Sequence, residues 1–573
     1  MSIAIPDLSP LRSPSAGPLA LSPEDQRWVE NTRDALSVEA QIAQLFVLSA
    51  RHDTLAEVDD LSTHAPGGIH RFPAHDLDAA WAATRHALDR ALDGTGVPLI
   101  LSGDIEGGTI SSPFTTAIPN QMGIAACDDL ALSADLARIV ARESRALGYN
   151  WSFTPVVDIN HAFRSAIVGT RSYGSDPQRI IDHARAYVHA LQADGIAACA
   201  KHWPGDGIDD RDQHMTTTVN DLSMAEWEES FGRIFGTLID DGVMTVMSAH
   251  IALPAYVRSR WPDAGRTAFQ PASVSRLLNE ELLRGQLGFQ GLIVSDATVM
   301  GGLTSWMDRA EAVPAVIENG CDVFLFSRDP GEDMALMLRG LREGRLSERR
   351  LHEAVTRTLT LKAKLGLHRM TNDERLAPVE RVREILRRPD HLAIAADAAG
   401  RSITLVKDRQ QLLPLDPTKH KRIAVIADEG SSFFSGAPER SFDPLRGALE
   451  ARGFAVRAFD PAAMPTPDDT DLVLYLIGQE TTPALGHIFL DFAKLHGSPR
   501  NAMIQFNREI PTLLLSFGQP YYLYDAPHVA TYINAYASLP DVQTALAERL
   551  LGDAPFAGVS PVDAFCGKEQ LTW

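Results

Sequence analysis

Short apolar runs recur along the first two thirds of the chain and alternate with amphipathic segments. Runs of this length, bounded by glycine, proline or polar residues, are typical of strands buried in a parallel sheet. They predict strands at residues 45–49, 67–70, 98–102, 151–157, 196–200, 243–248, 291–295 and 323–326. Helical periodicity fills most of the intervals, over residues 76–92, 128–147, 177–194, 225–241 and 310–319. Eight strands alternating with helices predict right-handed βαβ units that close into a (β/α)8 TIM-like barrel.

The pattern changes after residue 367, where an amphipathic helix over 351–367 ends. Helical signals continue to residue 398, and a second set of buried strands is predicted at 402–406, 422–426, 472–477, 511–516 and 529–533. These strands alternate with helices and indicate a C-terminal α/β sandwich domain. The predicted parts are a flexible N-terminal arm (1–22), the barrel (23–367), a helical linker (368–398) and the sandwich domain (399–573).

The composition narrows the class of protein. With 573 residues, 45% hydrophobic and 22% charged, the chain is a multidomain globular protein. A net charge of -21 disfavours nucleic acid and anionic membrane surfaces as partners. We expect a cytoplasmic location without membrane association, because the N-terminus lacks a charged segment followed by an apolar one and no apolar run is long enough to span a bilayer.

The four cysteines show no metal-ligand spacing, and no histidine or carboxylate set matches a metal motif. We therefore expect no metal and no cofactor, and interpret the cysteines as buried free thiols: Cys127, Cys199, Cys321 and Cys566.

Ionisable residues follow the predicted barrel strands, where the chemistry of a (β/α)8 barrel collects. In chain order they are Asp104, Asp158, Lys201 with His202, His250 and Asp296. Side chains from separate strands therefore converge on one rim.

The densest group of ionisable residues lies between Lys201 and His214. Asp212 and His214 are close enough for the carboxylate to orient the imidazole as a proton-transfer pair, or they form an Asx turn with an exposed histidine. Lys201 suits hydrogen bonds to sugar hydroxyls, a Schiff base or a salt bridge to a rim carboxylate. His202 is a ligand-binding residue or a satisfied rim histidine.

Three further residues have two interpretations each. Asp296, directly after an apolar strand, suits a nucleophile, a base or a ligand, or else it caps a helix that starts at Ala297. Asp104 can hold two ligand hydroxyls or cap the adjoining Gly-Gly turn. Arg171 lies between glycines and suits a planar polar contact, or it is a surface residue.

Five ordered motifs together carry a resemblance to a known family. They are Asp104-x-Glu106-Gly-Gly108, Gly169-x-Arg171-Ser-Tyr-Gly174, Lys201-His202-Trp-Pro-Gly205, Asp212-x-His214 and Ser295-Asp296. In this order, over residues 28 to 370, the sequence resembles family 3 glycoside hydrolases, in particular their β-N-acetylglucosaminidase branch. The C-terminal domain resembles the family's sandwich domain more weakly.

The resemblance implies a retaining mechanism on a small carbohydrate substrate. Asp296 would attack the anomeric carbon, and His214, paired with Asp212, would act as acid and base. Asp104, Arg171, Lys201 and His202 match the positions that hold the terminal sugar. We therefore expect an exo-acting β-N-acetylhexosaminidase that needs no cofactor.

Several alternatives stay open at this point. A histidine does not repel phosphate as a carboxylate would, so a phosphorylase is one of them. The others are a β-glucosidase that uses Glu480, a Schiff-base lyase that uses Lys201, and a silent sugar-binding protein. Oligomeric state is open as well.

Four residues in or beside these motifs differ from the usual sequence of the β-N-acetylglucosaminidase branch. The departures, which leave sugar identity and leaving-group preference open, are Trp203, Asp206, Gln213 and Ala297. Asp206, Asp209 and Asp210 are not expected to take part in the chemistry.

Overall fold

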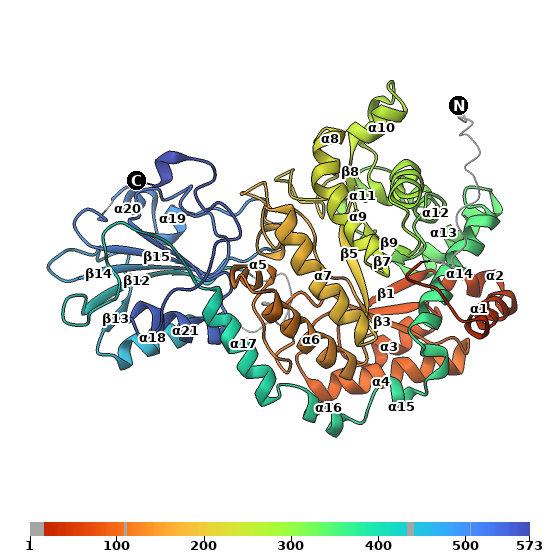
Figure 1. Ribbon diagram of the computed structural model, residues 1–573, viewed down its shortest axis with the longest axis horizontal. Helices are drawn as coiled ribbons and strands as arrows, with labels where there is room; N and C mark the ends of the chain where they lie inside the picture. The colour runs from red at the N-terminus through yellow and green to blue at the C-terminus, as the bar shows by residue number, and fades with distance from the viewer. Residues whose placement is uncertain (1–16, 108–111, 432–439, 505, 573) are drawn as a thin grey trace.

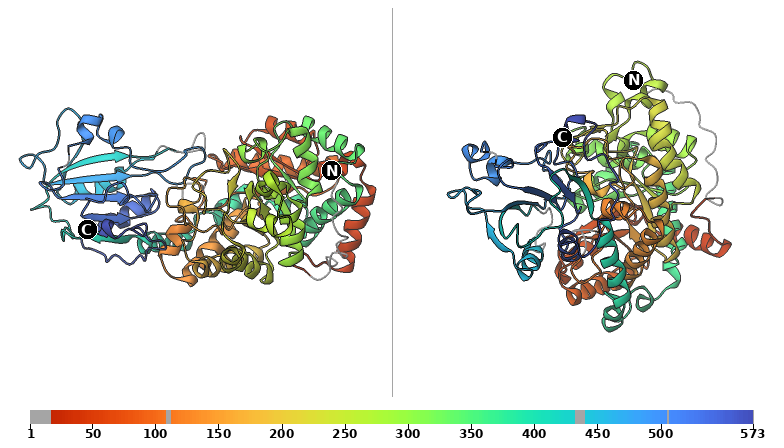
Figure 2. Two further views of the ribbon diagram at one scale, coloured as in Figure 1. Left: turned by 90° about the horizontal axis from the view of Figure 1, so that it is seen from above. Right: turned by 60° about the vertical axis from the view of Figure 1, so that its left-hand side comes forward.

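The computed structural model describes residues 17–107, 112–431, 440–504 and 506–572 and contains two lobes, an α/β barrel and a second α/β domain (Figure 1). Seen from above, the two lobes lie end to end (Figure 2). The predicted arm at residues 1–16 and Gly108 of the first motif lie outside the described residues. Residues 17–22 of the predicted arm (1–22) are described, and Leu19 among them is buried with the side chains that fill the barrel interior.

The barrel contains all eight predicted strands, arranged in parallel in the order β10-β1-β2-β3-β4-β5-β7-β9. A parallel bridge between Val294 and Val323 joins the two ends of this sheet and closes the barrel. The strands are β1 (Phe46–Ala50), β2 (Gly68–Arg71), β3 (Ile100–Gly103), β4 (Trp151–Ser152), β5 (Ala197–Trp203), β7 (Thr245–Ser248), β9 (Leu292–Ser295) and β10 (Phe324–Leu325).

The fourth strand is shorter than predicted because of Pro155. Proline has no N–H for the ladder, so regular pairing of β4 ends at Ser152 and resumes only as a single bridge between Val156 and Lys201.

Amphipathic helices bury their apolar faces against the outside of the barrel. The main ones are α1 (Pro23–Ala35), α2 (Val38–Ala43), α3 (Leu55–Ser62), α4 (Leu77–Gly94), α5 (Gln121–Ala126), α6 (Leu130–Ala146), α7 (Pro177–Ala193), α9 (Arg233–Asp240), α10 (Pro254–Arg260), α12 (Arg309–Glu318), α13 (Pro330–Arg342) and α14 (Glu348–Lys364). Between β7 and β9 the connection includes the π-helical segment η7 (Leu277–Gln286), which the periodicity did not predict.

Asp322 stabilises the closure of the barrel between β9 and β10. Its buried carboxylate accepts the N–H of Ile293 in β9 at 3.0 Å and is surrounded by three arginines. They are Arg284 at 2.6 Å, Arg357 at 3.0 Å and Arg350 at 3.3 Å. Burial by itself raises the pKa of Asp322, but the three guanidinium charges outweigh it and lower the pKa below the ordinary value.

Asp322→Ala is therefore expected to destabilise the barrel by about 3–5 kcal/mol, because it leaves buried guanidinium groups without their carboxylate. Since the pKa of Asp322 is lowered on folding, its contribution is present at neutral pH and is lost as the pH falls below the ordinary value of 3.8. Denaturant unfolding at neutral and acidic pH measures both effects. Asp373→Ala, which removes an exposed partner of Arg85, is the control and should change stability by about 1 kcal/mol or less.

The second domain has a six-stranded sheet in the order β11-β16-β15-β14-β12-β13, parallel except for the β11–β16 pair. Helices cover both faces, with α17 (Pro389–Ser402), α18 (Asp443–Ala451) and α21 (Pro540–Leu550) on one of them. The shorter α19 (Phe492–Leu495) and α20 (Pro499–Ala502) complete the domain. Its strands are β11 (Thr404–Asp408), β12 (Arg422–Asp428), β13 (Ala455–Ala458), β14 (Leu472–Ile477), β15 (Thr512–Ser516) and β16 (Thr531–Asn534).

The predicted linker is helical, with α15 (Asn372–Arg375) and α16 (Val379–Ile385) preceding α17. Helix α17 packs against α5 and α6 of the barrel as well as α21 of the second domain, and so lies between the two lobes (Figure 1). Three of the four free cysteines are buried as predicted, whereas Cys566 is partly exposed. Within the described ranges, no helix is both long and apolar enough to cross a membrane.

Candidate active site

A cavity of about 220 Å³ opens at the carboxyl ends of the barrel strands. Six of the seven residues predicted from the sequence line it, and the seventh, Asp212, lies directly behind His214. The six are Asp104, Arg171, Lys201, His202, His214 and Asp296. The barrel thus brings together side chains that are far apart in sequence.

One wall of the cavity is a network of two carboxylates and two cations. Lys201 Nζ lies 2.7 Å from Asp104 Oδ1 and 2.7 Å from Glu106 Oε1. Arg171 donates two hydrogen bonds to Glu106, at 2.7 and 2.9 Å. Burial raises the pKa of Glu106, but the charges of Arg171 and Lys201 outweigh it and hold that pKa far below its ordinary value. Asp104, whose side chain is 28% exposed, is the member of this network most open to a ligand.

The same contacts bear on the lyase alternative. Burial lowers the pKa of Lys201, but Asp104 and Glu106 outweigh it and raise the pKa overall. A Schiff base requires a neutral amine. The geometry therefore favours a lysine that donates hydrogen bonds as an ammonium group.

His202 is fixed from behind by Asp158. Its Nδ1 donates to Asp158 Oδ2 at 2.6 Å, and its backbone N–H donates to Asp158 Oδ1 at 3.1 Å. Because Nδ1 is occupied, Nε2 is the nitrogen available to a bound molecule.

Asp296 is a buried carboxylate that is held in its ionised form. Burial raises the pKa of Asp296, but His202, His250 and His214 lower it more, helped by the N–H of Ala297, which donates to Oδ1 at 2.7 Å. The next helix, α11 (Gly301–Thr304), has Met300 at its N-cap position, so the interpretation of Asp296 as a helix cap is wrong. An ionised carboxylate in a water-poor cavity is suited to nucleophilic attack.

Asp212 and His214 form the Asx turn and also the hydrogen-bonded carboxylate–imidazole pair that the sequence left as alternatives. Asp212 Oδ1 accepts the backbone N–H of His214 at 2.8 Å and its Nδ1–H at 2.7 Å. The imidazole is partly exposed to the cavity, with 28% of its side chain accessible. His214 Nε2 is thus the nitrogen free to exchange a proton with a ligand.

The loop that carries this pair is held from several sides. Gln213 accepts the N–H of His250 through Oε1 at 3.1 Å and contacts Asp206 through Nε2 at 3.3 Å. The carbonyl groups of Gln213 and His214 accept the N–H groups of Gly302 and Gly301 at 3.1 and 2.7 Å. The pair therefore has a defined position relative to the strand that bears Asp296.

Three residues in this constellation were not among the predicted site residues. Glu106 binds Lys201 and Arg171, Asp158 binds His202, and His70, at the end of β2, lies 3.5 Å from Asp104. Burial lowers the pKa of His70 to about 4, so the ring is neutral. Each of the three lies at or just beyond a strand end, and this signal had already marked Asp158 as a rim residue without assigning it to the site.

Glu480, the alternative acid, does not line the cavity. It is buried beneath the rim, where Asn120 Nδ2 donates to its carboxylate at 3.3 Å, while its neighbours Thr481, Thr482 and Pro483 reach the cavity wall. The barrel histidine His214 is thus better placed for proton transfer than Glu480.

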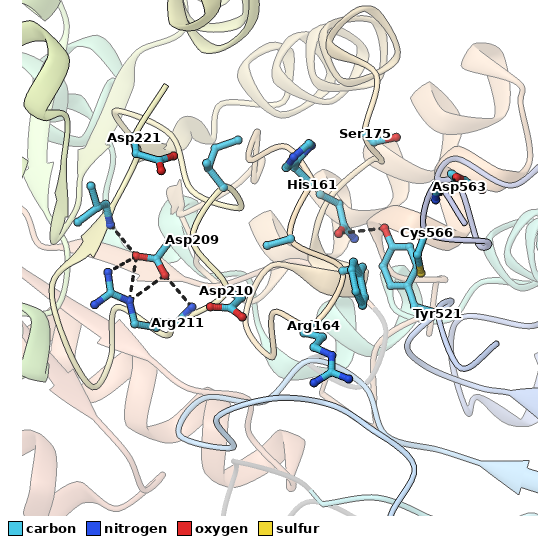
Figure 3. A pocket seen from close by; sticks show the side chains of 16 residues that line it. His161, Arg164, Ser175, Asp209, Asp210, Arg211, Asp221, Tyr521, Asp563 and Cys566 are labelled. Atoms are coloured by element: carbon cyan, nitrogen blue, oxygen red, sulfur yellow. Dashed lines mark hydrogen bonds and ion pairs between the residues drawn. The ribbon is translucent and has the colours of Figure 1, made fainter. Parts of the chain in front are cut away.

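Asp209 and Asp210 line a different cavity, of about 820 Å³, together with residues such as His161, Arg211 and Tyr521 (Figure 3). Asp209 is paired with Arg211, and Asp210 Oδ2 lies 3.1 Å from His487 Nε2. Their position agrees with the expectation that they take no part in the chemistry. The described part of the chain contains no cluster of three or more His, Cys, Asp or Glu side chains placed to hold a metal ion.

A closed α/β barrel with a buried ionised carboxylate, a carboxylate–imidazole pair and a wall of paired charges at its C-terminal rim is an architecture suited to a carbohydrate-active enzyme. Comparison with known proteins identifies the family. Residues 37–361 match the model for the "Glycosyl hydrolase family 3 N terminal domain". The chain therefore belongs to glycoside hydrolase family 3.

Individual relatives cover almost the whole chain. A "Beta-N-acetylglucosaminidase/beta-glucosidase" from Cellulomonas fimi is 40% identical over 97% of this chain and 98% of its own length. The solved structure of a "Beta-glucoside phosphorylase BglX bound to 2FGlc" has a TM-score of 0.90 and 36% identity, covering 97% of this chain and 99% of that one. A family 3 β-N-acetylglucosaminidase from Paenibacillus sp. str. FPU-7 shares the fold, with a TM-score of 0.75 and 23% identity over 92% of this chain and 99% of that one.

Proposed function

We propose that the protein is a retaining, exo-acting β-N-acetylhexosaminidase that removes a terminal β-linked N-acetylglucosamine. The observation that carries this proposal is the cavity in which Asp296 and the Asp212–His214 pair face the same small volume, beside the Asp104–Lys201–Glu106–Arg171 network. A small cavity closed by such a wall fits one terminal sugar. The relative from Cellulomonas fimi, named for N-acetylglucosaminidase and glucosidase activity, supports the substrate class.

In the first step, an oxygen of Asp296 attacks the anomeric carbon and the bond to the leaving oxygen breaks. His214 Nε2–H gives its proton to that oxygen, and Asp212 stabilises the imidazolium before the transfer. Asp104 and Lys201 hold hydroxyl groups of the sugar, and His202 Nε2 and Arg171 complete its contacts. The product of this step is a glycosyl ester of Asp296 and a free alcohol.

In the second step, neutral His214 removes a proton from a water molecule as the water attacks the same carbon. The ester bond breaks, Asp296 returns as a carboxylate, and the sugar leaves with its original β configuration. Each displacement inverts the configuration at the anomeric carbon, so the two together retain it.

Sugar preference is tested by comparing N-acetylglucosaminide and glucoside substrates that release the same chromogen. We expect the higher kcat/KM for the β-N-acetylglucosaminide. A higher kcat/KM for the β-glucoside would contradict the proposed preference while leaving the two-step mechanism intact.

Phosphate is a second candidate for the acceptor in the second step. Two further arginines, Arg51 and Arg440, also line the cavity, where a guanidinium group can contact an anion. A neutral histidine also leaves the approach of an anion unopposed. The phosphorylase that is 36% identical over 97% of the chain supports this candidate.

Product analysis with and without phosphate distinguishes the two acceptors. If water is the acceptor, free N-acetylglucosamine forms at the same rate in both reactions. If phosphate is the acceptor, the 1-phosphate replaces the free sugar and turnover rises with phosphate concentration. Arg51→Ala should then raise the KM for phosphate without changing turnover in its absence, whereas an exposed control, Arg349→Ala, should change neither.

A further inference from the structure

A segment of the second domain reaches the proton-transfer pair of the barrel. This segment, residues 479–487, follows β14 and is called the 479–487 loop below. The backbone N–H of Ala484 donates to Asp212 Oδ2 at 2.7 Å. The sequence motifs gave no reason to expect this contact, because a backbone group leaves no signature in the residue type.

The N–H of Ala484 provides a hydrogen-bond donor for the second carboxylate oxygen of Asp212. Its Oδ1 accepts both the N–H and the ring Nδ1–H of His214, and among the described residues the N–H of Ala484 is the donor to Oδ2. The Asp212 side chain is only 2% exposed, so water has little access to it. Burial raises the pKa of Asp212, but the bonds and charge of His214, together with the N–H of Ala484, lower it overall.

The position of the 479–487 loop is set by its contacts with the barrel. The N–H of Thr482 donates to the carbonyl of Ala166 at 2.9 Å, and the hydroxyl groups of Thr481 and Thr170 lie 2.6 Å apart. At the far end of the loop, His487 contacts Asp210, which is two residues from Asp212. Ala484 itself has φ of 65°, a left-handed conformation that is uncommon for residues with a side chain and turns its N–H toward the barrel.

We propose that the second domain is a working part of the proton-transfer site, and that Ala484 is a positioning residue for the Asp212–His214 pair. Its N–H fixes the carboxylate in one orientation as an anion, and the carboxylate in turn orients His214 Nδ1 and leaves Nε2 directed at the leaving oxygen. Proton donation therefore depends on docking of the second domain against the barrel. This inference rests on the proposed function, because it requires His214 to be the general acid.

The test replaces Ala484 by lactic acid through nonsense suppression, which exchanges the N–H for an ester oxygen and keeps the side chain. Two substrates are compared, a dinitrophenyl and a methyl β-N-acetylglucosaminide. A dinitrophenolate leaves without protonation, whereas an alcohol must be protonated as it leaves, so only the methyl glycoside reports on acid catalysis.

We expect kcat/KM for the methyl glycoside to fall about tenfold, as loss of a hydrogen bond to a charged group predicts. For the dinitrophenyl glycoside the change should be less than about twofold. The matched control is the same ester substitution at Leu485, the exposed neighbour in the loop, which should leave both values unchanged.

Equal losses on the two substrates would show that Ala484 matters only for folding or binding, and unchanged rates on both would show that the contact is dispensable. Either result overturns the inference. An unmodified protein that is inactive on every β-glycoside would instead contradict the proposed function itself, so the two failures are distinguishable.

A genetically encoded pair gives an independent measurement. Ala484→Gly keeps the N–H and accepts the left-handed backbone, so it should keep the wild-type ratio of methyl to dinitrophenyl activity. Ala484→Pro removes the N–H and also fixes φ at about −65°, far from the 65° of Ala484, so it displaces the loop as well and should lower that ratio by about tenfold or more. Equal ratios for the two variants would contradict the assignment.

Discussion

Asp296→Ala is expected to lower turnover of a dinitrophenyl β-N-acetylglucosaminide by about 10⁴-fold or more, which is the range observed when a catalytic nucleophile is removed. The substrate needs no proton from His214, so the loss isolates the first displacement. In the native protein the Asp296 carboxylate is buried and ionised, with three histidines around it and the N–H of Ala297 on Oδ1. Alanine removes the carboxylate that is proposed to attack the anomeric carbon, and the other carboxylates of the cavity, Asp104 and Glu106, are held in ion pairs with Lys201 and Arg171.

Covalent trapping identifies the nucleophile directly. A 2-deoxy-2-fluoro glucoside with a dinitrophenolate leaving group should accumulate as a glycosyl ester, and mass spectrometry of the digested protein should find it on the peptide that contains Asp296. Asp209→Ala, which changes a carboxylate in the other cavity, is the control and should keep wild-type labelling and turnover. Labelling of another carboxylate, or wild-type turnover by Asp296→Ala, would show that the assignment is wrong.

The fold could be predicted from the sequence because burial and apolar patterning coincide in this chain. All eight barrel strands are buried, so each appears in the sequence as an apolar run. The pattern missed the short strands β6 (Thr218–Val219) and β8 (Ile251–Ala252) and also β13 (Ala455–Ala458), at the edge of the second sheet, where two residues are exposed and two are half-buried. An edge strand need not be apolar, so the hydrophobic pattern does not find it.

The sequence predicted those residues of the candidate site that lie near the ends of the barrel strands. Asp104, Lys201, His202 and Asp296 follow apolar runs, and the barrel brings such positions to one rim. The pattern did not show which carboxylate holds which cation: Glu106, rather than Asp104 alone, binds both Lys201 and Arg171. Ion pairs of this kind depend on the closed barrel and cannot be predicted from the order of residues in the sequence.

Two of the residues that depart from the pattern of the β-N-acetylglucosaminidase branch are in contact with each other. Asp206 and Gln213 lie 3.3 Å apart, and Gln213 also accepts the N–H of His250 beyond β7. Burial and the neighbouring Asp158 raise the pKa of Asp206. Asp206 and Gln213 therefore form one structural unit that joins Asp158, the partner of His202, to the loop of His214, and neither of the two lines the cavity.

His214→Ala is expected to have the second largest effect, and one that depends on the leaving group. For a methyl β-N-acetylglucosaminide, kcat/KM should fall by about 10²–10⁴-fold, the usual contribution of a general acid. For a dinitrophenyl glycoside kcat/KM should change little, but kcat should fall because the glycosyl ester waits for a general base. Pre-steady-state measurements should then show a burst of dinitrophenolate followed by slow turnover.

Azide provides the decisive measurement on this variant. A small anion attacks the glycosyl ester without losing a proton, so azide should restore turnover of the dinitrophenyl glycoside and yield the β-glycosyl azide. Asp212→Asn, which keeps the shape of the pair but removes its charge, should show a smaller loss of kcat/KM for the methyl glycoside, because the imidazolium loses its anionic partner. The control is His161→Ala, in the other cavity, which should behave as wild type. Losses that are equal for both leaving groups, with no response to azide, would place the acid–base role on a residue other than His214.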